Sequence, residues 1–319
     1  MLDILEPSRS NIEKVASALF EGTLVAIPTE TVYGLAANAE NEFAVKRIYK
    51  VKGRPNNHPV IVHIGSLKYI DKWAIDVPDY AMELANYFWP GPMTLILKRT
   101  NLAKNFVTGG QDSVGLRIPR HPVALSIVNK FHDLGGNGLV APSANKFEAV
   151  SPTDANSVLI ELGSILDSKK DFVIDGGSSE VGIESTIINC LNTTPRILRQ
   201  GAITKYHIEN CLQTKVEINK SNSGIQFSGN QFRHYAPKAK IFLNKEPQEG
   251  DGFLALSSID TPQGCVRLGT PKTPSEFARI LYSTFRKADQ LGLKRFIVIP
   301  PQGDGIELAI LERLEKASR

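Results

Sequence analysis

The sequence predicts an α/β protein with an open, mixed, twisted sheet, followed by a smaller second α/β domain. Its 319 residues, 42% hydrophobic and 22% charged, are typical of a globular chain long enough for one large domain or two. Apolar strand-like runs mix with helical patterns without strict βαβ alternation, which favours an open sheet over a barrel. A polar stretch rich in Ser, Asn and Gly around residues 210–230 indicates a linker. We therefore expect domains at 1–208 and 239–319, joined by a linker at 209–238.

The first domain begins with a helix. Ser10 and Glu13 have the spacing of a capping box, and Gly22 stops the pattern. Apolar runs predict strands at 23–28, 59–64, 94–98, 114–119, 138–143, 171–175 and 185–190. Helical periodicity predicts helices at 41–52, from Pro78 onward, near 122–131 and near 154–162.

The second domain has the same two kinds of segment. Short strands are expected at 240–243, 252–256, 265–268 and 295–301, and helices at 274–291 and 306–317.

Composition excludes several classes of protein. The net charge of +4 is mild, so it permits an anionic partner without indicating one. The three cysteines are far apart in the sequence, which disfavours a disulfide framework or a zinc site. His207 and Cys211 are four residues apart, as a metal-binding pair can be, but no second pair lies nearby in the sequence. We therefore expect no protein-bound metal. With no span-length apolar run and no N-terminal leader pattern, a cytoplasmic protein without membrane contact is expected.

The segment KGRPNNHPVIVH (52–63) carries the first candidate chemistry. Pro55 favours extended dihedrals at Arg54, so Lys52 and Arg54 project in the same direction and suit a polyphosphate; a solvated basic helix end is an equal alternative. His63 falls at the carboxyl end of a strand, where open α/β sheets gather ligands, although a satisfied core histidine is the alternative. No Walker A, G-x-S-x-G or H-E-x-x-H motif is present.

Further polar residues follow other predicted strands. Thr31 lies in PTETVYG, and Arg117, inside an apolar strand, needs an anionic partner. Short hydroxyl and amide side chains that suit phosphate or ribose occur at Ser143, Asn145 and Ser151. For Ser151 an ordinary turn and helix N-cap is the favoured alternative. GIESTIIN places Glu184, Ser185 and Thr186 at a strand start, and Arg196 and Arg199 lie on opposite faces if their run is extended.

Six motifs in this order resemble the YrdC-like domain of the threonylcarbamoyl-AMP synthases: PTETVYGLA, KGRPNNHPVIVHI, VGLRIPRHP, APSANKF…SPT, GGSSEVGIESTII and PRILRQGAI. FRHYAPKAKIFL resembles the junction of the two-domain members. The resemblance implies a YrdC-like sheet with helices around a large cavity and a C-terminal Rossmann-like domain.

The resemblance also implies an L-threonylcarbamoyladenylate synthase, a nucleotidyltransferase that converts L-threonine, bicarbonate and ATP with Mg²⁺. Its product serves the threonylcarbamoyl-transferase machinery that modifies tRNA beside the anticodon, and direct tRNA contact is possible. The implied threonine-side residues are Thr31, His63, Arg117, Ala141 and Ser185. The implied ATP-side residues are Lys52, Arg54, His58, Ser113, Ser143, Asn145, Ser151, Arg199, His234 and Tyr235. The resemblance further implies a catalytic role for Lys52 and Arg54, and it implies that His234 and Tyr235 belong to the linker segment that folds over the site. The chain departs from the family at His58, where asparagine is common.

Two other functions stay open at this point. An RNA-binding module without adenylate-forming activity fits a basic sheet, although only 8% of residues are aromatic. A carbamoyl-adenylate former that uses carbamoyl phosphate, as in hydrogenase maturation proteins, is disfavoured because this chain lacks the zinc-finger cysteine pairs of those proteins.

Overall fold

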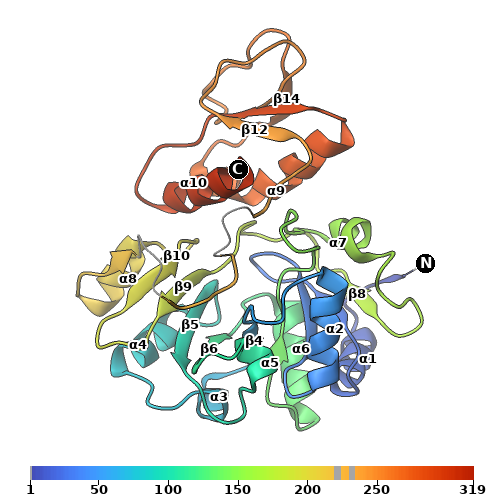
Figure 1. Ribbon diagram of the computed structural model, residues 1–319, viewed down its shortest axis with the longest axis vertical. Helices are drawn as coiled ribbons and strands as arrows, with labels where there is room; N and C mark the ends of the chain where they lie inside the picture. Colours follow the sequence, from blue (N-terminus) through green and yellow to red (C-terminus); the bar gives the residue numbers. More distant parts are fainter. Residues whose placement is uncertain (1, 219–223, 230–233) are drawn as a thin grey trace.

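The computed structural model describes residues 2–218, 224–229 and 234–319, and it divides into a large lower domain and a small upper one (Figure 1). The large domain contains strands β1 (Ile4–Leu5), β2 (Val25–Ile27), β3 (Gly34–Asn38), β4 (Ile61–His63), β5 (Met93–Lys98), β6 (Ser113–Arg117), β7 (Leu139–Val140), β8 (Phe172–Ile174), β9 (Thr186–Asn189), β10 (Arg196–Arg199) and β11 (Glu217–Ile218). Its helices are α1 (Arg9–Phe20), α2 (Glu42–Lys52), η1 (Leu67–Tyr69), α3 (Ile70–Trp73), α4 (Asp79–Phe88), α5 (Asn105–Thr108), α6 (Pro122–Asp133), α7 (Ala155–Leu162) and α8 (Lys205–Leu212).

The large sheet is open and mixed, as the irregular order of helices and strands predicts. Its eleven strands run β1-β8-β2-β3-β7-β4-β6-β5-β9-β10-β11. The centre combines both pairing types, because β4 is parallel to β6 and antiparallel to β7. The parallel register pairs His63 with Arg117, which places two candidate site residues side by side.

Local signals explain several element boundaries. Helix α1 is capped by Ser8, whose side chain accepts the N–H of Asn11, so the capping box expected at Ser10 is wrong. Helix α2 begins after Asn41, whose side chain caps it, and ends at Gly53 with a φ of 62°. This left-handed stop turns the chain sharply after Lys52, just before the PNNHP segment.

Part of the segment expected to be a linker pairs with the large sheet. Residue 208 falls inside α8, and β11 pairs in parallel with β10, so residues up to 218 belong to the large sheet. A polar composition alone does not reveal this last edge strand, because two residues are too few for a periodic pattern.

The small domain is a parallel α/β unit. It contains β12 (Lys240–Leu243), β13 (Gly252–Leu254), β14 (Val266–Gly269), α9 (Pro274–Gln290), β15 (Arg295–Val298) and α10 (Ile306–Ala317). The sheet order is β12-β15-β13-β14, with all three pairings parallel. Helices α9 and α10 lie between this sheet and the large domain (Figure 1).

The core of the small domain extends into the large one. The same apolar cluster holds Phe277 and Phe285 of α9 together with Val32, Val150 and Ile183 of the large domain. The two domains therefore share buried surface directly above the region where the candidate site residues gather. Within the described ranges, none of the helices combines the length and apolar content that a bilayer crossing needs.

We predict that Tyr33→Phe lowers the free energy of unfolding by about 1 kcal/mol. The buried Tyr33 hydroxyl accepts the N–H of Gly176 at 3.0 Å and donates to the carbonyl of Gly177 at 2.8 Å, tying the PTETVYG turn to the end of β8. Urea denaturation measures the change. Tyr87→Phe is the matched control, because Tyr87 is 72% exposed and the loss of its hydroxyl should leave the free energy of unfolding unchanged. Equal stabilities for Tyr33→Phe and the unaltered protein would contradict this role.

Candidate active site

Many of the predicted site residues line one buried cavity at the carboxyl ends of β4 and β6. The predicted residues in its wall are Thr31, Arg54, His63, Arg117, Ala141, Ser143, Ser185, Arg199, His234 and Tyr235. Residues that sequence reasoning did not assign complete the wall: Val32, Ile61, Pro142, Glu184, Ser228 and Gly229. Because loops after several strands meet here, the cavity has the location at which open α/β sheets bind ligands.

His63 is a neutral ring in the wall of this cavity. Its side chain is buried, and burial together with the nearby charge of Arg117 lowers its pKa to about 3. Ile61, two residues earlier on β4, lines the same cavity, because side chains two apart on a strand lie on the same face. A neutral imidazole beside a guanidinium can exchange hydrogen bonds with a polar substrate without adding charge.

Arg117 already has an anionic partner within the protein. Its Nη2 lies 2.7 Å from Oε1 of Glu30, and both side chains are buried. The other oxygen of Glu30 accepts the backbone N–H of Arg120 at 3.1 Å. Sequence reasoning asked for an anion near Arg117 but missed Glu30, although this acid stands in the middle of the quoted PTETVYG motif. Among the described residues nothing accepts from the buried Nε of Arg117, so part of this guanidinium is available to a ligand.

Two further arginines, Arg54 and Arg199, line the same cavity. Arg54 donates from Nη2 to the carbonyl of Pro59 at 2.8 Å, and burial lowers its pKa to about 10. Arg199 donates from Nε to the carbonyl of Ser185 at 3.0 Å and from Nη2 to its hydroxyl at 3.1 Å. Arg196, by contrast, lies outside and pairs with the exposed Glu217, so the two arginines of this run do point to opposite faces.

Lys52 occupies a different place from the one expected. Its ammonium donates to the carbonyl of Ser143 at 2.5 Å and to that of Asn145 at 2.6 Å, and it is not in the cavity wall. Burial, aided by the charge of Arg54, lowers the pKa of this amine well below its ordinary value. In this structure Lys52 therefore fixes the loop that follows β7, while Arg54 alone of the basic pair reaches the cavity.

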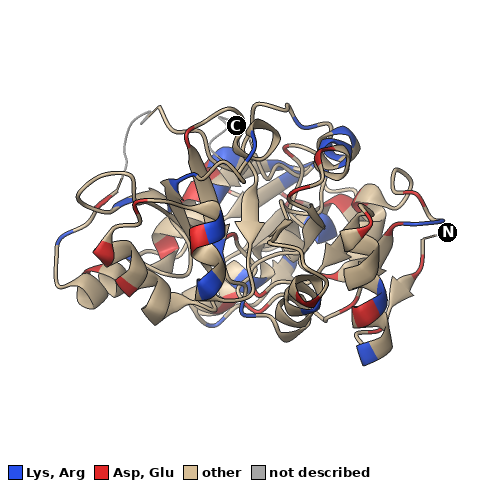
Figure 2. Cartoon of the chain, turned by 90° about the horizontal axis from the view of Figure 1, so that it is seen from below, with Lys and Arg blue, Asp and Glu red and all other residues tan. Residues whose placement is uncertain are grey.

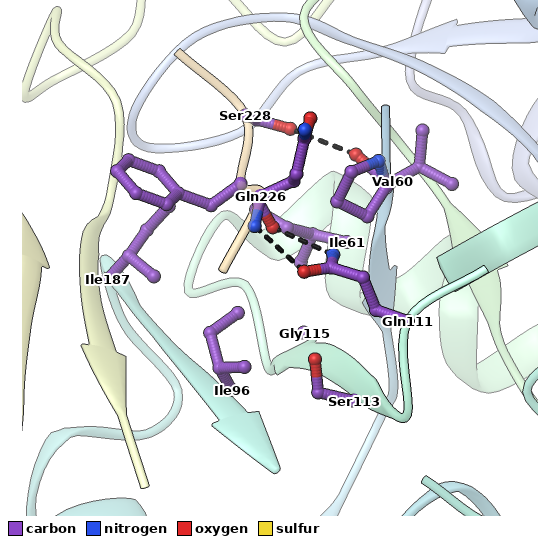
Figure 3. Close-up of a pocket in the computed structure, with 11 residues that line it drawn as sticks. Val60, Ile61, Ile96, Gln111, Ser113, Gly115, Ile187, Gln226 and Ser228 are labelled. Atoms are coloured by element: carbon purple, nitrogen blue, oxygen red, sulfur yellow. Dashed lines mark hydrogen bonds between the residues drawn. The ribbon is translucent and has the colours of Figure 1, made fainter. Parts of the chain in front are cut away.

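Four other predicted residues lie near the cavity but outside its wall. The hydroxyl of Ser151 donates to Oε1 of Glu184 at 2.7 Å, and the amide of Asn145 donates to the carbonyls of Lys146 and Ala149. The partly buried ring of His58 packs edge-on against Phe147. Ser113 lies at the start of β6 in a smaller pocket next to the cavity (Figure 3).

Linker residues line both the cavity and the smaller pocket: residues 226–228 line the pocket, and residues 228–229 line the cavity. Gln226 exchanges two hydrogen bonds with Gln111, and Phe227 packs against an apolar patch of Ile96 and Ile187 (Figure 3). The Ser228 hydroxyl accepts from Arg54 at 3.2 Å, and its carbonyl accepts from Arg199 at 2.8 Å. A segment distant in sequence thus closes the cavity by binding its cations.

His234 and Tyr235 come from the same linker and lie in the cavity wall, where the sequence places a segment folded over the site. Tyr235 has a φ of 62°, which turns the chain back toward the small domain. Burial, followed by the charges of Lys52 and Arg54, lowers the pKa of His234 well below its ordinary value. The ring therefore stays neutral among the cations of the site.

Among the described residues, the cavity wall contains no set of side chains suited to bind a metal ion. Across residues 2–218, 224–229 and 234–319, no group of three or more His, Cys, Asp or Glu side chains could hold one. The two buried carboxylates near the cavity, Glu30 and Glu184, are already bound to Arg117 and Arg313. His207 serves in the capping box of α8 with Thr204.

A mixed sheet with a buried cationic cavity, closed by a linker from a second α/β domain, defines a YrdC-like enzyme. Two family models match: the Sua5, YciO and YrdC family, described as telomere recombination, over residues 17–201, and the threonylcarbamoyl-AMP synthase C-terminal domain over 203–319. The chain belongs to the threonylcarbamoyl-AMP synthase family, whose members are tRNA-modification enzymes.

Individual relatives match this chain over nearly its whole length. The threonylcarbamoyl-AMP synthase of Pyrococcus abyssi is 36% identical, spanning 96% of this chain and 94% of the relative. That of Bacillus subtilis is 33% identical, spanning 99% and 95%. The crystal structure of P. abyssi Sua5 complexed with L-threonine matches with a TM-score of 0.88 at 33% identity, covering 100% of this chain and 97% of that one.

We predict that His63 makes the protein lose stability in acid. The unfolded chain protonates this ring below about pH 6.5, whereas the folded ring resists protonation down to about pH 3. The free energy of unfolding should therefore fall between these values, by at most about 1.4 kcal/mol per pH unit. His63→Asn should make this loss shallower in urea denaturation at pH 6.5, 5.5 and 4.5. The same change at the exposed His207 is the control, and identical slopes for both variants would refute the assignment.

Proposed function

We propose that the chain is an L-threonylcarbamoyladenylate synthase, which makes threonylcarbamoyl-AMP and pyrophosphate from L-threonine, bicarbonate and ATP. The observation that carries the proposal is the convergence of Arg117 and His63 with Arg54 and Arg199 on one buried cavity. The relative with L-threonine bound, which has the same fold, supports the choice of amino acid. The product then serves the machinery that transfers the threonylcarbamoyl group to tRNA.

The proposed threonine end of the cavity is the side formed by β4 and β6. The free Nε of Arg117 is a donor for the α-carboxylate, and the neutral ring of His63 lies beside it. The Thr31 and Ser185 hydroxyls suit the polar side chain and amine, and the small Ala141 leaves room for them. The buried carboxylate of Glu30 forms an ion pair with the guanidinium of Arg117, and this ion pair fixes the orientation of the guanidinium that the amino acid would bind.

The proposed ATP end is the side of Arg54 and Arg199. Both cations are bound only to neutral oxygens among the described residues, so their charge is uncompensated by a direct carboxylate contact. Such guanidinium groups suit triphosphate oxygens. Lys52 contributes by fixing the carbonyls of Ser143 and Asn145. Mg²⁺ enters with ATP as part of the substrate.

The reaction needs no covalent bond to the enzyme. The threonine nitrogen adds to the carbon of bicarbonate and water leaves, which gives a carbamate. A carbamate oxygen then attacks the α-phosphorus of ATP; the bond to the bridging oxygen breaks, and its electron pair leaves with pyrophosphate. The enzyme supplies positioning and charge stabilisation, and it excludes water from two labile species.

The linker must move during this cycle. In the structure the cavity has a free volume of about 50 Å³, far less than the hundreds of Å³ of typical ligand sites. Ser228 occupies donors on Arg54 and Arg199 that a triphosphate needs. ATP would replace these contacts with charged ones, which are stronger.

One assay tests the proposal. The protein is incubated with ATP, Mg²⁺ and bicarbonate, with and without L-threonine, and both pyrophosphate and the adenylate are measured. Pyrophosphate and threonylcarbamoyl-AMP should form only when threonine and bicarbonate are both present. Pyrophosphate release at the same rate with and without L-threonine would overturn the proposal.

We predict that Arg54→Ala lowers threonine-dependent pyrophosphate release by about 100-fold or more, because it removes a cation that stabilises the charge developing on the phosphates. The variant should keep its fold, measured by circular dichroism. Arg9→Ala on α1 is the control, since the Arg9 side chain is 88% exposed. Near-normal release by Arg54→Ala would contradict the role of this residue.

An RNA-binding module is the second candidate, and the charge distribution does not favour it. Basic and acidic residues are interspersed over the chain (Figure 2), and the arginines that converge do so inside the buried cavity. Strongly salt-dependent tRNA binding without threonine-dependent turnover would support that candidate instead.

A further inference from the structure

The small domain packs on the loop that carries Glu184 and Ser185 into the cavity wall. Gly182 in this loop has a φ of +77°, and a Cβ added there would lie 2.5 Å from the Cα of Arg279 in α9. The next residue, Ile183, is buried in the core of the small domain. The backbone that leads to Glu184 is thus pressed directly against helix α9.

Three segments of the site are anchored in the same way. Val32, Val150 and Ile183 all belong to the apolar core of the small domain. Their chain neighbours Thr31, Ser151 and Glu184 are polar residues at or beside the cavity. Each of these three buried apolar residues is therefore adjacent in the chain to a polar residue of the site. Packing in the small domain constrains the site through the backbone.

Glu184 is also held through its carboxylate. Oε2 accepts from the hydroxyl of Tyr282 on α9 at 2.9 Å and from Nε of Arg313 on α10 at 3.3 Å. Oε1 accepts from the Ser151 hydroxyl at 2.7 Å. Arg313 is fully buried, and its Nη1 donates to the carbonyl of Gln200 at 2.6 Å. Two side chains of the small domain thus bind one oxygen of a cavity residue, while the other oxygen binds the large domain.

The carboxylate of Glu184 takes its partners from Tyr282, Arg313 and Ser151 and not from Arg199. Both residues line the cavity, yet the structure contains no ion pair between them, although both lie in the described part of the chain. Arg199 instead bonds to the carbonyl and hydroxyl of Ser185 and to the linker. Arg199 lines the same cavity, and its charge, after that of Arg313, already helps to lower the pKa of Glu184. If Oε2 of Glu184 lost its partners, Arg199 is a cation of the cavity wall that would compete to replace them. Such a pair would neutralise a charge that the ATP end of the cavity needs.

We propose that Tyr282 and Arg313 of the small domain are positioning residues of the active site, which hold the Glu184 carboxylate so that Ser151 is oriented and Arg199 stays free of a carboxylate partner. The inference rests on the proposed function for the identity of the anionic substrate. It assigns the second domain a part in building the nucleotide end of the site.

Tyr282→Phe in the full chain tests this inference, because it removes one hydroxyl and retains the buried ring. The KM for ATP and the Kd for ATP, measured by calorimetry, should rise by about tenfold, as expected for losing one hydrogen bond to a carboxylate. The KM for threonine should stay within about twofold, because Arg117 and His63 are untouched. A merely structural defect would lower the melting temperature and affect both substrates alike.

Thr284→Val is the matched control. The Thr284 hydroxyl is also buried on α9, but it donates to the carbonyl of Leu281 and does not touch Glu184. ATP affinity should be unchanged in this variant. Unchanged ATP affinity in Tyr282→Phe, or an equal loss in Thr284→Val, would overturn the inference.

The calorimetric measurement separates this inference from the proposed function. If the unaltered protein binds ATP but shows no threonine-dependent turnover, the proposed function fails, while weaker ATP binding by Tyr282→Phe still supports the positioning role. If the unaltered protein binds no ATP, both fail.

Discussion

Burying several arginines in one fold requires an oxygen for each of them, and this constraint organises the protein. Arg117 and Arg313 have carboxylate partners, Glu30 and Glu184, so their charges are largely balanced. Arg54 and Arg199 bond to carbonyl and hydroxyl oxygens instead. The fold thus divides its buried cations into a compensated set, which fixes geometry, and an uncompensated set, which gives the cavity its attraction for anions.

The mixed sheet brings these groups together from distant parts of the sequence. Parallel pairing of β4 with β6 sets His63 beside Arg117, while the loops after β7 and before β9 supply other residues of the cavity wall. The linker then adds polar atoms that only meet the sheet in the folded state. Catalysis by positioning suits such a site, because the reactants carry the chemistry and the protein supplies orientation and a dry environment.

Sequence patterns predicted much of this, and their failures have physical causes. The apolar run at 59–64 correctly predicted a strand that ends near His63, and apolar patterns located the strands and helices of the small domain. The use of Lys52 could not be predicted, because its partners are backbone carbonyls 91 and 93 residues away in sequence. Glu30 was missed for the same reason: a buried ion pair is visible only once the strands are in register.

The anchoring of Glu184 has a consequence for how the site forms during synthesis. Glu184 and Arg313 are separated by 129 residues. At about 5–20 residues per second, roughly 6–26 s pass between the translation of the two. During that interval the apolar side chains of Val32, Val150 and Ile183 are not yet covered by the complete core of the small domain. The nascent chain therefore contains the large sheet and most of the cavity wall before the helix that binds the Glu184 carboxylate has been made, and the final geometry of that wall is complete only with α10.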